Sequence, residues 1–303
     1  MTNTVLILGA SGRFGHNAAI AFERAGWQVR RFDRQADTLR EAVHGVQVIV
    51  NAWNPTYPDW ADQVPRLHAE VIEAAQMVNA TVIVPGNVYV YGPDNGAVWR
   101  PTTPHKATNP LGVIRREMEA AYRDSGVRTI ILRAGDFIDT RASGNWFDMV
   151  MTKTLPKGVF RYPGQTGIPH AWAYLPDLAC AAVLLAEKRE ELNRFEDVAF
   201  AGYTLSGQEM CDALARVSGR DLRLKQVNWL PFRLAAPFWK LGACLLEMRY
   251  LWNTPHALGG ERLAELLPEF EVTPVDTALK CAIAWQDQEP SAVPLTTSTQ
   301  TSR

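Results

Sequence analysis

A glycine-rich turn near the start of the chain constrains the fold more than any other feature. Residues 9–15 read Gly-Ala-Ser-Gly-Arg-Phe-Gly and follow an apolar run from Thr4 to Leu8, which we expect to be a buried strand. After the turn, apolar residues recur at helical spacing until Gly26 ends the pattern. This order of strand, turn and helix lets backbone N–H groups at a helix N-terminus approach a pyrophosphate. We therefore expect a dinucleotide to be held by Gly9, Ser11, Gly12, Arg13, Phe14 and Gly15.

Short β-rich runs and amphipathic helical stretches alternate through the first two-thirds of the chain. We expect further strands at 27–32, 46–51, 81–84 and 127–132, and an apolar helical stripe at 64–78. Such an alternation is typical of a parallel sheet covered by helices on both faces. The predicted fold class is therefore α/β, a Rossmann-like doubly wound parallel sheet.

The pattern changes after Leu132. The stretch 134–174 is rich in Trp, Gly and Pro, and an almost entirely apolar helix is expected over about 176–186. Another helix is predicted to begin at Ser206, which starts an S-x-x-E capping box, and to end at Gly219. Helices rich in Leu and Trp are expected to follow, which indicates a second, smaller lobe.

These patterns divide the chain into two structural units. We assign residues 1–135 and about 174–202 to a dinucleotide-binding domain. We assign about 136–173 and 203–285 to a mostly helical substrate lobe. Residues 286–303 are polar, rich in Pro and Thr and aperiodic, which predicts a disordered tail.

The composition excludes several classes of partner. The 31 Lys and Arg residues against 32 Asp and Glu give a net charge of −1, so we expect no nucleic acid or anionic membrane as a partner. The four cysteines contain no C-x-x-C pair, which argues against a zinc site, and we expect no metal. No run of about eighteen uncharged apolar residues occurs, and the first residues lack the basic segment of a signal peptide. We expect a cytoplasmic protein.

An acidic residue stands at the end of the second predicted strand. Asp33 follows Gly15 at a spacing at which a carboxylate binds the ribose hydroxyls of NAD. Three arginines, Arg13, Arg31 and Arg34, could instead hold the 2′-phosphate of NADP. The sequence therefore predicts NAD(P) as the cofactor and leaves the choice between NAD and NADP open.

The chain resembles the extended short-chain dehydrogenase/reductase family, which contains sugar-nucleotide epimerases and dehydratases, from Thr4 to about Trp285. In such proteins the N-terminal part binds the nicotinamide cofactor and the C-terminal lobe closes over the substrate. The resemblance adds Asn51, Ala52, Trp53, Asn87 and Arg115 to the expected cofactor-binding residues. It is carried by the ordered motifs GASGRFG at 9–15, Asp33, VIVNAW at 48–53, VYVYG at 88–92, ILRAGDF at 131–137 and YLPDLACAAVLLAE at 174–187.

The chain departs from this family where the reactive residues would be. The family usually carries a Ser at the position of Asn87, and a Tyr-x-x-x-Lys pair whose Tyr transfers a proton. Aligning residues 110–119 places Leu111 at the Tyr position and Arg115 at the Lys position. Leucine has no proton to give, whereas Asn87 and Arg115 can still donate hydrogen bonds to a substrate carbonyl and to ribose. The sequence predicts a retained cofactor platform with a different proton donor.

Four residues are candidates for the missing chemistry. They lie on loops after strands or in the stretch expected to cover the pocket, where a titratable group would face the nicotinamide. A Tyr or His can act as a general acid and a desolvated Asp as a base. The candidate catalytic residues are Asn87, Tyr89, Asp136 and His170.

The ten tryptophans fall into two groups. Trp53, Trp60, Trp146 and Trp172 lie on segments expected to meet at the cleft, where they could form walls for a flat or apolar substrate or simply fill the core. Core filling is favoured for the tryptophans of the expected C-terminal helices, Trp229, Trp239, Trp252 and Trp285.

Three functions are compatible with the sequence. The first is an NAD(P)-binding oxidoreductase or epimerase-like enzyme that acts on a small carbonyl or hydroxyl compound with a non-standard proton donor. The second is a dinucleotide-binding sensor or regulatory protein without turnover. The third is a lyase or isomerase that retains its cofactor. The resemblance also suggests a homodimer through the helices at about 60–78 and 106–124.

Overall fold

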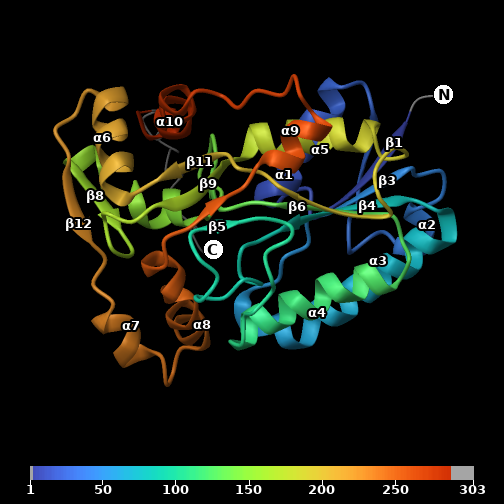
Figure 1. Cartoon of the computed structure of the whole chain (residues 1–303), viewed down its shortest axis with the longest axis horizontal. Helices are drawn as coiled ribbons and strands as arrows, with labels where there is room; N and C mark the ends of the chain where they lie inside the picture. Colours follow the sequence, from blue (N-terminus) through green and yellow to red (C-terminus); the bar gives the residue numbers. More distant parts are fainter. Residues whose placement is uncertain (1–2, 288–303) are drawn as a thin grey trace, which may run out of the picture.

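A six-stranded sheet forms the centre of the computed structural model, which describes residues 3–287 (Figure 1). Most of the predicted tail at 286–303 lies outside the described residues. The sheet has the order β10-β6-β4-β3-β1-β2, and all its neighbouring pairs are parallel. Its strands are β1 (Thr4–Leu8), β2 (Gln28–Arg31), β3 (Val48–Asn51), β4 (Thr81–Gly86), β6 (Thr129–Arg133) and β10 (Phe195–Ala199). The predicted α/β class and the five strands predicted in this sheet are confirmed, whereas β10 was not predicted.

Helices cover both faces of this sheet. The helices α1 (Arg13–Arg24) and α5 (Leu175–Glu187) pack together on one face, and α3 (Trp60–Val78) and α4 (Pro110–Asp124) lie side by side on the other (Figure 1). The short α2 (Leu39–Ala42) packs beside α3. Alternate residues of β1 enter the two cores, since successive side chains of a strand point to opposite faces. This explains why β1, β3, β4 and β6 are nearly continuous apolar runs.

The smaller lobe is mixed: it combines the expected helices with short strands that were not predicted. Its strands have two to five residues and pair with segments far away in the chain, so they leave no periodic signal over a window long enough to recognise. Three small sheets contain β7 (Asp136–Ile138), β9 (His170–Tyr174) and β11 (Tyr203–Leu205); β8 (Val159–Tyr162) and β12 (Arg223–Gln226); and β5 (Val98–Trp99) and β13 (Ala257–Leu258).

The helices of this lobe are short. The capping box at Ser206 and Glu209 forms as predicted, and α6 ends at Gly219 in the left-handed conformation. Within residues 3–287, no helix is both long and apolar enough to cross a membrane. The α-helices are α6 (Gly207–Ser218), α7 (Leu230–Ala235), α8 (Lys240–Met248), α9 (Glu261–Leu266) and α10 (Val275–Ile283). The single-turn segments are η1 (Tyr57–Asp59), η2 (Phe147–Met151), η3 (Leu155–Lys157), η4 (Arg249–Asn253) and η5 (Ala284–Asp287).

Candidate functional site

The glycine turn joins β1 to α1, and its backbone atoms are tightly packed. Gly9 has a φ of 76°, which favours glycine, and its carbonyl accepts a hydrogen bond from the Gly12 N–H at 2.9 Å. A Cβ on Gly15 would lie 2.2 Å from the Gly9 oxygen, so only glycine lets α1 begin this close to the strand. No side chain caps α1 at Gly12. The first N–H groups of the helix are therefore available to an anion, which fits the phosphates of a dinucleotide.

The turn lies where the strand order reverses. Strand β1 lies between β2 and β3, so the chain leaves β1 in one direction and later returns on its other side. A Cβ on Gly9 would come within 2.9 Å of the Ala52 carbonyl, which shows how closely the loop after β3 approaches the turn. Ligands of open α/β sheets bind at such a reversal point, at the carboxyl ends of the strands.

A loop of the smaller lobe covers the glycine turn. The Arg13 guanidinium donates hydrogen bonds to the carbonyl oxygens of Ser143 (3.2 Å) and Gly144. From the opposite direction, Arg141 donates to the carbonyl oxygens of Ser11 and Gly12, each at 3.3 Å. Two cations thus lie beside the turn. Arg141 was not predicted as a site residue because 129 positions separate it from Gly12.

The residues expected near the adenosine ribose lie at the exposed end of β2. The Asp33 carboxylate accepts a hydrogen bond from the Gln35 N–H at 2.9 Å. The Arg34 guanidinium lies 4.4 Å from the centre of the Trp53 ring. Arg31 forms an ion pair with Glu23. Of the three arginines considered for a 2′-phosphate, Arg34 is the one next to Asp33.

Asn51 faces the interior. Its amide nitrogen lies 3.1 Å from His68 Nδ1 and 3.1 Å from the Tyr122 hydroxyl, and the Asn51 side chain is buried. The Asn51 amide oxygen accepts a hydrogen bond from the Trp53 N–H at 3.3 Å. The Asn51 side chain therefore fixes the start of the loop after β3, and Ala52 and Trp53 are the residues of that loop that lie toward the site.

A buried arginine supports the loop after β4. Arg133 donates to the Asn87 carbonyl at 2.6 Å and forms two-pronged ion pairs with Glu119 and Asp197. Burial by itself would lower the pKa of Arg133, but the two carboxylates more than offset this and raise it. His105, Glu119 and Asp197 have spacings that suit a metal. Arg133 already supplies the positive charge that holds these carboxylates together, so the three acidic and histidine side chains with Arg133 stabilise the fold.

The two residues that the sequence resemblance aligns with a Tyr and a Lys, Leu111 and Arg115, differ in their surroundings. Leu111 is buried at the start of α4, where its N–H donates to the Glu247 carboxylate at 2.8 Å. Arg115 lies 4.1 Å from the centre of the Trp60 ring and donates to Asn54 Oδ1 at 2.6 Å. Among the described residues, its Nε has no hydrogen-bond partner. Burial lowers the pKa of Arg115.

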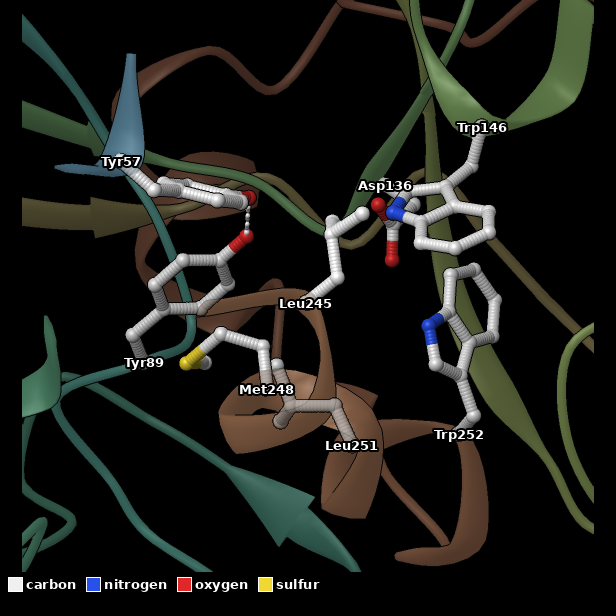
Figure 2. A pocket seen from close by; sticks show the side chains of 8 residues that line it. All are labelled: Tyr57, Tyr89, Asp136, Trp146, Leu245, Met248, Leu251 and Trp252. Atoms are coloured by element: carbon white, nitrogen blue, oxygen red, sulfur yellow. Dashed lines mark hydrogen bonds between the residues drawn. The ribbon is translucent and has the colours of Figure 1, made fainter. Parts of the chain in front are cut away.

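A small pocket lies between the two lobes near this point (Figure 2). On one side the Tyr57 and Tyr89 hydroxyls are 2.6 Å apart, and on the other the Asp136 carboxylate faces the cavity. Burial, with a further contribution from the Asp136 charge, raises the pKa of both tyrosines, so both are protonated at neutral pH. The cavity encloses about 10 Å³, and Leu245 occupies much of the space between the polar groups.

A buried histidine stands behind Asp136. His170 Nε2 lies 2.7 Å from Asp136 Oδ2, and the His170 ring is stacked on Trp252 with centroids 4.4 Å apart. The ring of His256 packs against His170 at the same distance. Figure 2 shows Asp136 beside Trp146, with Trp252 below them. The carboxylate is therefore the member of the Asp136–His170 pair that reaches the pocket.

Three of the four candidate catalytic residues are brought to this site. Tyr89 and Asp136 line the pocket and His170 contacts Asp136. The Asn87 side chain instead accepts the Tyr89 N–H at 3.0 Å and forms the turn that presents Tyr89. Tyr57 was not predicted, although it follows β3 in the chain and could have been found by the rule that led to Tyr89.

The tryptophans divide differently from the expectation. Trp146 lines the pocket, and so does Trp252, which the sequence pattern had assigned to the core. Trp60 and Trp172 are fully buried within the core clusters. Trp252 is brought to the pocket because η4, a single turn, follows α8 directly and turns the ring toward His170.

Two buried histidines predict a loss of stability in mild acid. Burial lowers the pKa of His68 and of His256 to about 3, below the value of about 6.5 in an unfolded chain. Below pH 6.5 the unfolded state therefore binds protons that the folded state does not, and stability falls as the pH decreases toward 3. Between pH 7 and pH 5 we expect each histidine to lower the free energy of unfolding by about 2 kcal/mol.

Urea unfolding at the two pH values measures this effect. The variant His68→Gln should show a smaller pH dependence than the parent, and His44→Gln, at an exposed position, should leave it unchanged. Equal pH dependence in all three proteins would contradict the assignment of neutral, buried histidines.

Comparison with known proteins supports the fold. No protein-family model and no curated protein sequence matches this chain. Among solved structures, a nucleoside-diphosphate-sugar epimerase from Pseudomonas aeruginosa superposes with a TM-score of 0.73 at 14% identity, covering 94% of this chain and 97% of the other. The dTDP-glucose 4,6-dehydratase of Bacillus anthracis, in complex with NAD, gives 0.72 at 13% identity, with 95% and 97% covered. MoeE5, in complex with UDP-glucose and NAD, gives 0.70 at 16% identity, with 94% and 98% covered. The chain thus has the fold of the extended short-chain dehydrogenases/reductases along nearly its whole length.

Proposed function

We propose that this protein is an NAD(P)-dependent oxidoreductase or epimerase-like enzyme that acts on a small carbonyl or hydroxyl compound. The observation that carries the proposal is the pocket in which a hydrogen-bonded tyrosine pair faces a carboxylate backed by a histidine. This pocket lies between the dinucleotide-binding fold and the smaller lobe, where the resembled family closes over its substrate. It supplies titratable groups that replace the tyrosine missing at Leu111.

The residues of the turn fit a nicotinamide dinucleotide. Gly9, Gly12 and Gly15 leave the backbone free of Cβ atoms, and the uncapped start of α1 with Arg13 and Arg141 provides donors for the pyrophosphate. We assign the adenosine end of the site to the loops after β2 and β3. When bound, the cofactor would supply or accept a hydride.

The residues of the pocket divide the remaining work. The hydroxyls of Tyr57 and Tyr89 remain protonated because their pKa values are raised, so this pair donates a hydrogen bond to the substrate oxygen. Asp136, held in place by its hydrogen bond to His170, passes a proton to the substrate oxygen or takes one from it. Neither Leu111 nor Asn87 takes part in the transfer.

Cofactor titration and turnover test this function separately. We expect NADH to bind the purified protein, as followed by nicotinamide fluorescence, and carbonyl substrates to lower the nicotinamide absorbance. Gly12→Val should abolish binding, since its side chain would crowd the Gly9 carbonyl. Binding without any absorbance change across aldehydes, ketones and alcohols would instead indicate a dinucleotide sensor. Retained binding in Gly12→Val would contradict the cofactor site itself.

Substitutions at the end of β2 test the preference between the two cofactors. We expect NAD(H) to be preferred, because a 2′-phosphate would be repelled by the Asp33 carboxylate. Asp33→Ala should weaken NADH binding by about tenfold, as expected for a lost hydrogen bond to a charged group. Arg34→Ala should weaken NADH and NADPH alike, since it removes a planar group above Trp53. A loss confined to NADPH in Arg34→Ala would identify the protein as NADP-dependent.

A further inference from the structure

Resting on the proposed function, we infer that this pocket takes an uncharged, largely apolar carbonyl or alcohol rather than a nucleoside diphosphate sugar. Eight side chains line it. Besides the two tyrosines and Asp136, these are the apolar or aromatic side chains of Trp146, Leu245, Met248, Leu251 and Trp252. The polar groups that line it are the tyrosine hydroxyls on one side, and the Asp136 carboxylate with the indole N–H groups of Trp146 and Trp252 on the other (Figure 2). An uncharged ligand in this pocket therefore meets polar groups on two sides and apolar side chains between them.

The charges around the pocket disfavour a diphosphate. A diphosphate is held by arginine, lysine or clustered N–H donors, and among the described residues that line the pocket none is Lys or Arg. The ionisable acid there, Asp136, would repel an anion. Nearby guanidinium groups have other contacts, because Arg115 donates to Asn54 and Arg133 is held between two carboxylates. Burial of a diphosphate without compensating cations would be strongly unfavourable.

The smaller lobe supplies part of the apolar wall from α8. Leu245 and Met248 come from α8, a helix of nine residues that follows the six-residue α7. The adjoining surface is exposed, as Leu234 is 71% and Phe238 95% exposed. A cavity of about 10 Å³ holds little more than one water molecule, so a substrate enters by displacing α8 side chains. An apolar substrate replaces the contacts that those side chains lose.

The aromatic pair defines the shape of the apolar part. Trp146 and Trp252 meet edge to face, with centroids 5.4 Å apart at 68°. Stacking of His170 on Trp252 fixes that ring, since their planes are within 2° of parallel. The two rings form an angled aromatic wall beside Asp136, which suits an alkyl chain or an aromatic ring attached to the carbonyl carbon.

A homologous series of ligands tests the inference. Methyl ketones from butanone to decanone are assayed with saturating NADH, and alkyl amides of the same lengths, which are not reduced, are followed by tryptophan fluorescence. We expect kcat/KM for the ketones and affinity for the amides to increase about fourfold per added CH₂ until the pocket is filled. UDP-glucose should neither compete with the longest amide nor change the fluorescence. A response independent of chain length, or UDP-glucose binding more tightly than the longest amide, would overturn the inference.

The two readouts keep this inference distinct from the proposed function. Chain-length-dependent amide binding with no ketone reduced would remove the oxidoreductase function and leave the apolar site established. Reduction of short polar carbonyls with no increase in kcat/KM with chain length would support the oxidoreductase function and overturn the apolar site. Leu245→Ala should lengthen the preferred chain by about three carbons, the size of the removed group, with unchanged NADH affinity. Leu234→Ala, on the exposed surface of α7, is the matched control and should behave as the parent.

Discussion

Replacing Asp136 with Asn is expected to lower kcat by at least about a hundredfold, the lower end of what a general acid or base contributes. The amide keeps the shape of the side chain and a contact to His170, but it cannot exchange a proton at neutral pH. Because Asp136 belongs to the substrate pocket and not to the glycine turn, the affinity for NADH should stay within about twofold of the parent. Stopped-flow absorbance of the nicotinamide measures the rate, and fluorescence titration measures the affinity.

Companion variants identify the role of the carboxylate. His170→Gln should also lower kcat, and the double variant should lose little more than Asp136→Asn alone, because the two residues act as one unit. Tyr89→Phe should reduce kcat by less than Asp136→Asn does, because Tyr57 can still donate a hydrogen bond to the substrate oxygen. Asp276→Asn, a substitution in an exposed ion pair, is the matched control. A parental kcat in Asp136→Asn would move the proton transfer to the tyrosine pair.

Arg133→Met is expected to destabilise the protein by about 3–5 kcal/mol. The substitution leaves the buried carboxylates of Glu119 and Asp197 facing each other without the cation that now bridges them. It also removes the donor to the Asn87 carbonyl, which fixes the loop that presents Tyr89. Urea unfolding at neutral pH should show the loss directly.

An ion pair on the protein surface provides a comparison with the buried one. Arg216 and Asp276 form an ion pair at 2.8 Å with both side chains about half exposed, so Arg216→Met should change stability by less than about 1 kcal/mol. Adding Glu119→Gln and Asp197→Asn to Arg133→Met should restore part of the stability, because no buried charge then lacks a partner. Equal losses of stability in Arg133→Met and Arg216→Met would show that the buried carboxylates do not depend on the charge of Arg133.

The sequence determined most of the half that contains the central sheet because its signals are local. The turn at 9–15 needs glycines because Gly9 has a positive φ and because a Cβ on Gly15 would collide with the Gly9 carbonyl. Four of the six central strands, β1, β3, β4 and β6, are runs of mainly apolar residues, which indicate strands by themselves. Strand β10 escaped prediction because its sequence, Phe-Glu-Asp-Val-Ala, contains two charged residues. Those charges are paired with arginines that lie 64 and 66 positions away, so the tertiary fold makes that strand possible.

The same distinction separates the two parts of the site. Gly9, Gly12 and Gly15 could be found from spacing, whereas the reactive pocket combines residues from segments that share no periodicity. Tyr57 and Tyr89 follow different strands of the central sheet, Asp136 begins β7, and Trp252 belongs to the single turn η4. A hydrogen bond of 2.6 Å joins the hydroxyls of Tyr57 and Tyr89, and another of 2.7 Å joins Asp136 to His170.

The sequence by itself therefore determined five of the six central strands and the turn, because each depends on neighbouring residues or on backbone sterics. Only the tertiary structure decided which side chains line the pocket and that Asn51 faces the interior. It also added short strands, which were not predicted, to the helices of the smaller lobe. These outcomes depend on burial and on contacts between distant segments, and such contacts exist only once the two lobes have packed against each other.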